Sequence, residues 1–108
     1  MINEDQLDLV FGALADRTRR GILARLADGD TSVSDLVSRF AMSQPAISKH
    51  LKVLETAGLV SRSRQGTMRL SHLEAEPLQQ ATAWIGTYRE FWDEGFDRLD
   101  DLLRRMDD

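Results

Sequence analysis

With 108 residues and 42% hydrophobic content, the chain is long enough for one compact domain over residues 1–108 and too short for a second. The absence of cysteine excludes disulfides, thiolate metal ligands and thiol chemistry. The segment Met1–Asp5 lacks the basic and apolar regions of a signal peptide, and no apolar run approaches the ~18 residues of a membrane helix. We therefore expect a cytoplasmic protein that does not enter the membrane.

Charge is distributed unevenly along the chain. The formal net charge is -4, yet residues 41–73 carry five lysines and arginines against a single acid, Glu55. Residues 74–108 carry ten acids and four arginines. Such asymmetry either reflects the uneven solvation of two surfaces or indicates one face for a polyanion and another for a different contact.

Four helices are predicted in chain order, each from apolar residues at helical spacing and from a polar residue that caps its start. The caps are Asn3, Asp16, Ser32 or Ser34, and Ser43. The second helix ends at Asp28-Gly29-Asp30 and the fourth near Ala57-Gly58. The inward positions are Leu7, Val10, Phe11 and Leu14; Ile22, Leu23 and Leu26; Leu36, Val37 and Phe40; and Ile47, Leu51 and Leu54.

After the fourth helix the apolar period shortens to that of a strand. Residues 60–71 alternate around a turn at Gln65-Gly66, which predicts a β-hairpin with one face on the core and one basic face in water. Pro77 then starts a long last helix with apolar residues as far as Leu103. The predicted fold is mainly α with a small β-hairpin, in the order α-α-α-α-β-β-α, with the long C-terminal helix in a dimer interface.

A third and fourth helix joined by a tight turn, followed at once by a basic hairpin, are typical of a winged helix-turn-helix. Turning Ile47, Leu51 and Leu54 inward leaves polar side chains outward near the start of the fourth helix, where recognition helices contact base edges. Glutamine suits adenine, serine suits bases or phosphates, and lysine and arginine suit phosphates. The predicted DNA-binding residues are Gln44, Pro45, Ser48, Lys49, His50, Lys52, Arg62, Arg64, Gln65, Gly66 and Arg69.

Several of these residues have a second interpretation. His50 lies one position from the apolar stripe, so it either packs at the edge of the core or contacts DNA. Arg19 and Arg20 either form solvated or acid-paired side chains or contact phosphate. The arginines of the hairpin either contact DNA or keep an edge strand from aggregating.

Three stretches of the sequence resemble signatures of the ArsR family of bacterial winged-helix repressors. Residues 13–23 (ALADRTRRGIL) resemble the first signature and residues 42–60 (MSQPAISKHLKVLETAGLV) the recognition-helix signature. Pro77-Leu78, Trp84 and residues 88–93 (YREFWD) resemble the tail of a subgroup without the usual metal sites. The chain departs from the family at Arg17, where a proline is usual, and at Thr67, where a basic residue is common.

The resemblance implies a homodimer that represses transcription at an imperfect palindrome, with its first and last helices in the interface. An exposed apolar stripe on the last helix is read first as a dimer seam and second as an effector pocket. The predicted interface residues are Leu7, Val10, Phe11, Leu14, Trp84, Tyr88, Trp92, Phe96 and Leu99.

The resemblance also bears on metal sensing, since one metal site of the family uses two cysteines that correspond here to Ser32 and Ser34. Neutral serine is a poor ligand for zinc-like ions, and the last helix contains no histidine for a second kind of site. We expect no metal, no cofactor and no enzymatic site, because no nucleophile elbow, phosphate loop or HExxH motif is present.

The sequence therefore predicts a homodimeric, metal-independent (auto)repressor. Its expected partners are double-stranded operator DNA, a second copy of the chain and an unknown small-molecule effector. The alternative is a winged-helix protein-interaction module without specific DNA binding.

Overall fold

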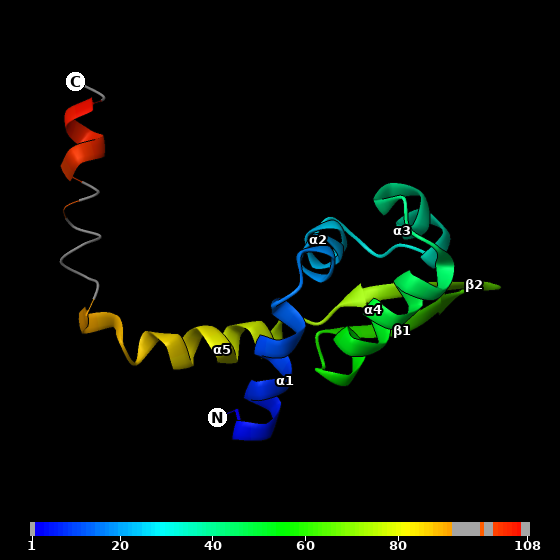
Figure 1. Cartoon of the computed structure of the whole chain (residues 1–108), viewed down its shortest axis with the longest axis horizontal. Coiled ribbons are helices and arrows are strands. Elements are labelled where there is room, and N and C mark those ends of the chain that lie inside the picture. The colour runs from blue at the N-terminus through cyan, green and yellow to red at the C-terminus, as the bar shows by residue number, and fades with distance from the viewer. Residues whose placement is uncertain (1, 92–97, 99–100, 107–108) are drawn as a thin grey trace.

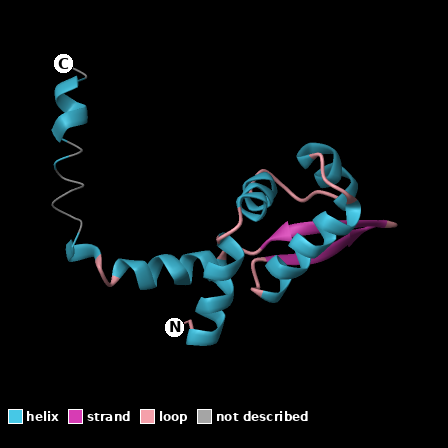
Figure 2. Cartoon of the chain, in the orientation of Figure 1, coloured by secondary structure: helices cyan, strands magenta, loops and turns pink. Residues whose placement is uncertain are grey.

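The computed structural model describes residues 2–91, 98 and 101–106. Four helices come first, then an antiparallel hairpin and a further helix, which confirms the predicted order of elements (Figures 1 and 2). The elements are α1 (Glu4–Leu14), α2 (Arg17–Leu26), α3 (Val33–Phe40), α4 (Gln44–Thr56), β1 (Val60–Gln65), β2 (Met68–Leu73), α5 (Glu76–Gly86) and the 3₁₀ turn η1 (Arg89–Phe91). No helix in this part of the chain has the length and apolar character to cross a membrane.

Polar caps define where the first four helices begin. The side chains of Asn3, Asp16, Ser32 and Ser43 each accept a hydrogen bond from the backbone N–H three residues later. Each bond satisfies a donor that the first helical turn leaves without a partner. Of the two serines predicted to open α3, Ser32 is the cap.

The core lies between α1, α2, α4 and the base of the hairpin, with α3 packed against α4. The largest side chains that are fully enclosed are Val10, Ile22, Leu36, Ile47, Leu51, Leu54 and Leu59. Because these residues come from every element of the helix-turn-helix and from the loop before the hairpin, burying them fixes α4 and the hairpin relative to the body.

Two left-handed residues bound α4. Ala41 (φ 52°) lies in the turn between α3 and α4, and Gly58 (φ 78°) follows the end of α4. The conformation at Gly58 suits glycine, whereas at Ala41 it is strained because a Cβ approaches the backbone. Together they hold the short turn before α4 and its sharp exit into β1.

The hairpin does not divide into one core face and one basic face, as the sequence predicted. Register pairs Val60 with Leu73, Arg62 with Ser71 and Arg64 with Arg69, so the arginines share a face with Val60. That face meets the core at its base and carries cations toward its tip, because the strands extend beyond the body (Figure 1). The tight turn is at Gly66-Thr67 rather than Gln65-Gly66, since Gln65 pairs with Met68.

The long last helix of the sequence prediction is interrupted. Helix α5 ends at Gly86, and the backbone N–H groups of Thr87 and Tyr88 bond three residues back. The Thr87 hydroxyl also donates to the carbonyl of Trp84, so glycine flexibility and a competing side-chain bond together explain the break. Figure 1 shows α5 leaving the body past α1. Residues 101–106 are again helical.

Candidate nucleic-acid interface

The outer face of α4 is polar from its first residue. Gln44 and Pro45 occupy the first turn, as proline permits there, and both are exposed. Lys49 and Lys52 are also exposed, and Ser48 is half-buried. Since Ile47, Leu51 and Leu54 turn into the core, α4 presents mainly these residues outward, with the partly exposed Val53 near its end.

The hairpin adds cations beside this face. Arg62, Arg64 and Arg69 are exposed, as are Gln65 and Gly66 at the turn. Arg64 lies directly opposite Arg69 on the same face, and like charges so placed repel one another. An anion bound across the pair would relieve that repulsion.

A groove joins α4 to the hairpin. It encloses about 610 Å³ between the start of α3, the outer face of α4 and the hairpin. Gln44, Ser48, Arg62 and Arg69 all line it. The groove thus holds residues from both predicted contact regions. We call the groove, together with the exposed Lys49, Lys52, Arg64, Gln65 and Gly66, the α4–hairpin surface.

One cation of this surface is already paired. The guanidinium Nε of Arg62 donates to the Glu55 carboxylate at 2.6 Å, and this bond raises the pKa of Arg62. Glu55 lies in the last turn of α4, so the pair also ties the hairpin to that helix. Sequence reasoning missed the pair, although Glu55 is the single acid among residues 41–73.

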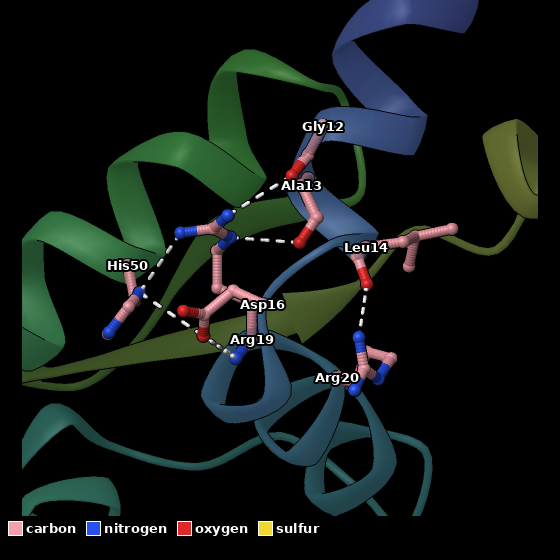
Figure 3. Close-up of polar contacts among 7 residues, drawn as sticks. All are labelled: Gly12, Ala13, Leu14, Asp16, Arg19, Arg20 and His50. Carbon is pink, nitrogen blue, oxygen red and sulfur yellow. Dashed lines mark hydrogen bonds and ion pairs between the residues drawn. The ribbon is translucent and has the colours of Figure 1, made fainter.

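His50 faces the body rather than the outer surface. Its Nδ1 lies 3.3 Å from Nη1 of Arg19 and 3.9 Å from the Asp16 carboxylate, and its side chain is 18% exposed (Figure 3). The structure therefore supports the packed interpretation, and we remove His50 from the predicted contact set. The backbone N–H of Arg19 is the main cause that lowers the pKa of Asp16.

Arg19 and Arg20 stabilise the end of α1. Arg19 donates to the carbonyls of Gly12 and Ala13, and Arg20 donates to that of Leu14 at 2.7 Å (Figure 3). The last carbonyls of a helix lack partners within it, and cations there also favour the helix dipole. The sequence prediction considered acid pairs and phosphate contacts for these two residues, but not bonds to backbone carbonyls. The position of two arginines just after the end of a helix could have indicated such bonds.

A row of aromatic rings forms a second surface that runs from α1 along α5 to the 3₁₀ turn η1. Phe11 packs edge-on against Trp84, which packs edge-on against Tyr88, which in turn contacts Phe91. Trp84 is 39% exposed, Tyr88 47% and Phe91 77%. Such contiguous exposed aromatic area is typical of an interaction surface.

The predicted dimer residues divide into four groups, of which the first is the exposed pair Trp84 and Tyr88. Leu7 and Val10 are buried in the core of the protomer, so their side chains have no surface to offer a partner, and that assignment was wrong. Phe11 and Leu14 are half-buried, and Phe11 contacts Trp84 of α5. Trp92, Phe96 and Leu99 lie outside the described residues.

Side chains suited to metal ions are scattered. Among residues 2–91, 98 and 101–106, no three His, Asp or Glu side chains are arranged to hold an ion. His72 pairs with Asp30 at 2.7 Å, and Ser32 serves as a helix cap.

Comparison with known proteins assigns the family. Residues 16–62 match the family described as "Bacterial regulatory protein, arsR family". The transcriptional repressor SdpR of Bacillus subtilis is 38% identical over 76 residues, which cover 70% of this chain and 84% of SdpR. The chain belongs to the ArsR family. The regulator Rv2034 of Mycobacterium tuberculosis is 48% identical over 67 residues, which cover 62% of this chain and 63% of Rv2034.

Solved structures agree with this ArsR assignment. The ArsR family transcriptional regulator RHA00566 superposes with a TM-score of 0.76 at 38% identity, covering 85% of this chain and 95% of that one. A winged helix-turn-helix domain from Mycobacterium bovis, described as homodimeric, superposes with a TM-score of 0.65 at 29% identity, covering 80% of each chain. The chain is therefore a winged helix-turn-helix regulator of the ArsR type, and such regulators are not enzymes.

Proposed function

We propose that this ArsR-family protein is a transcriptional repressor that binds a specific operator, and that residues 1–108 act as one DNA-binding and dimerisation domain. The α4–hairpin surface carries the proposal, because its groove brings Arg62 and Arg69 together with Gln44 and Ser48, and Lys49 and Lys52 are exposed on the same helix, α4. The acidic starts of α1 and α5 lie on the side of the body away from the hairpin tip (Figure 1).

In this proposal α4 enters the major groove and the hairpin follows the adjacent backbone. Gln44 and Ser48 contact base edges, and Lys49, Lys52 and Arg64 contact phosphates. Arg69, Gln65 and Gly66 bring the hairpin tip to the adjacent DNA backbone. Pro45 shapes the first turn of α4.

The proposed repressor is a homodimer joined through the aromatic surface of α1 and α5. Exposure of Trp84, Tyr88 and Phe91 supports this, and the related domain from Mycobacterium bovis is described as homodimeric. Two-fold symmetry would place the two copies of α4 about 34 Å apart, so the operator is a palindrome with half-sites one turn apart.

Regulation in this proposal is independent of transition metals. The full sequence contains no cysteine, and serine at positions 32 and 34 offers only a neutral hydroxyl. The first operator to test is the one upstream of the protein's own gene, which would make it an autorepressor. A small molecule that relieves repression is compatible with the same DNA contacts.

A protein-interaction module is the second candidate, because the exposed aromatic surface fits a protein partner. The two candidates differ in whether the lysines and arginines of the α4–hairpin surface are required. A repressor needs them to bind DNA, whereas a protein-interaction module does not.

The test is a fluorescence-anisotropy titration of the purified protein onto its own upstream region. Scrambled DNA, several salt concentrations and a chelator serve as controls. Selective, chelator-insensitive binding of one dimer per site supports the repressor. Weak and equal binding to both DNAs calls for selection from genomic fragments, and failure to enrich any fragment there contradicts the repressor and favours the interaction module.

A further inference from the structure

The side chain of Arg19 joins three helices. It stands on α2, donates Nε to the Ala13 carbonyl at 2.8 Å and Nη2 to the Gly12 carbonyl at 3.1 Å, both at the end of α1. Its remaining terminal nitrogen, Nη1, lies 3.3 Å from His50 Nδ1 on α4 (Figure 3). One rigid, planar group thus links the end of α1 to the middle of α4.

The chemistry of the link fixes which atom carries the proton. A guanidinium has only donors, so His50 Nδ1 must accept, and the proton of the neutral ring is then on Nε2. The Asp16 carboxylate accepts the Arg19 backbone N–H at 3.0 Å and so fixes the first turn of α2, on which Arg19 stands. The geometry at α4 therefore depends on a chain of directional bonds in addition to apolar packing.

We propose that the Arg19–His50 bond sets the angle of α4 relative to α1, which makes both residues positioning residues for operator half-site spacing. The proposal rests on the proposed function. There α1 belongs to the dimer surface and α4 to the DNA surface. In a symmetric dimer, the separation of the two copies of α4 follows from the angle between these helices.

Arg20 provides a matched control. It donates to the Leu14 carbonyl at the end of the same helix, at 2.7 Å, but its guanidinium extends away from α4 (Figure 3). Arg20→Lys therefore weakens the cap of α1 without touching the link, whereas Arg19→Lys weakens both. His50→Leu removes the acceptor, while His50→Asn places a side-chain oxygen close to where Nδ1 lies.

The experiment uses the operator that the wild type selects, and versions of it lengthened or shortened by one base pair between the half-sites. It measures the affinity of each folded, dimeric variant for all three DNAs. In Arg19→Lys and His50→Leu we expect the preference for the native spacing to fall about fivefold, the size of one net hydrogen bond. Arg20→Lys and His50→Asn should keep the wild-type preference. Equal losses at all three spacings would mean a merely structural role and overturn the proposal.

A second readout needs no DNA. Nitrogen-15 NMR of the wild-type imidazole should show His50 in the Nε2–H tautomer, and a mixed tautomer should appear in Arg19→Lys. An Nδ1–H tautomer in the wild type would overturn the link even if the protein binds its operator as proposed. If the wild type selects no operator, the proposed function fails, and the positioning role fails with it.

Discussion

On and near the α4–hairpin surface, two basic residues are each paired with an acidic residue. Glu55 holds Arg62 within the surface, and Asp30 holds His72 on the next strand. Both pairs are open to solvent, with the basic partner about half exposed in each, so each contributes little to stability. Their larger effect is on which cations are available to an anionic partner.

Removing the Glu55 carboxylate should strengthen DNA binding. Glu55→Gln frees Arg62 and deletes the one acid of the cationic segment, so affinity for all sequences should rise and the salt dependence should steepen by up to about one ion. Anisotropy titrations at several salt concentrations measure both. Glu76→Gln, at the start of α5, is the control and should change neither; weaker binding by Glu55→Gln would mean that the pair holds Arg62 in its working position.

The His72–Asp30 pair gives a pH dependence of defined sign. The hydrogen bond from His72 to the Asp30 carboxylate is the main cause that raises the pKa of His72 above its ordinary value of about 6.5. The pair therefore stabilises the fold fully below that value, and the contribution is lost as pH rises through the raised pKa. Urea unfolding should show wild type losing stability from pH 6 to 8 relative to Asp30→Asn. An NMR titration giving the same His72 pKa in both proteins would contradict this.

At the scale of elements, the same left-handed conformation occurs at both ends of α4, in a residue that it strains and in one that it suits. Ala41 holds a left-handed conformation that costs an alanine free energy, and Gly58 holds one that glycine adopts freely. Each position connects the recognition helix to a neighbour.

Exchanging these residue types should move stability in opposite directions. Ala41→Gly should raise the free energy of unfolding by up to about 1 kcal/mol, and Gly58→Ala should lower it by about 1 kcal/mol or more. A Cβ at position 58 would make an ordinary contact, 3.4 Å from the Gln6 amide nitrogen, so the expected cost comes from the backbone conformation. Urea denaturation measures both. Equal effects of one sign would contradict the assigned backbone conformations.

Local signals explain which elements the sequence predicted. Side-chain caps and apolar spacing act within one helix, so α1 to α4 and the hairpin were predictable. The break at Gly86 was missed, because the aromatic stripe continues past this glycine and favoured one continuous helix. Contacts across the fold had no such signal, since Arg19 and His50 are 31 residues apart. The alternating pattern predicted the strands but not what each face of the hairpin contacts. Val60 and Arg64 lie on the same face, yet Val60 is buried in the core and Arg64 is exposed to solvent.

For the whole molecule, the aromatic surface of α1 and α5 lies apart from the α4–hairpin surface. Figure 1 shows α5 extending to one side of α1 and the tip of the hairpin pointing to the opposite side. A dimer through the first surface leaves the second free on both copies, which is what a palindromic operator requires.

A charge placed in the aromatic surface should separate the dimer. Tyr88→Glu puts a carboxylate among Trp84 and Phe91, where burial against a partner would be costly. We expect a monomer in sedimentation and the loss of specific operator binding. Gln79→Glu adds the same charge at an exposed position of α5 and should remain dimeric. A dimer that persists in Tyr88→Glu would move the interface elsewhere.

The most direct measurement is the salt dependence and sequence selectivity of three variants of the α4–hairpin surface. Lys49→Ala and Arg64→Ala should weaken binding to operator and scrambled DNA alike and reduce the salt slope by about one each. Gln44→Ala should leave the slope unchanged and lower selectivity by about 1–3 kcal/mol. If all three variants bind both DNAs as the wild type does, this surface does not contact DNA and the account is contradicted.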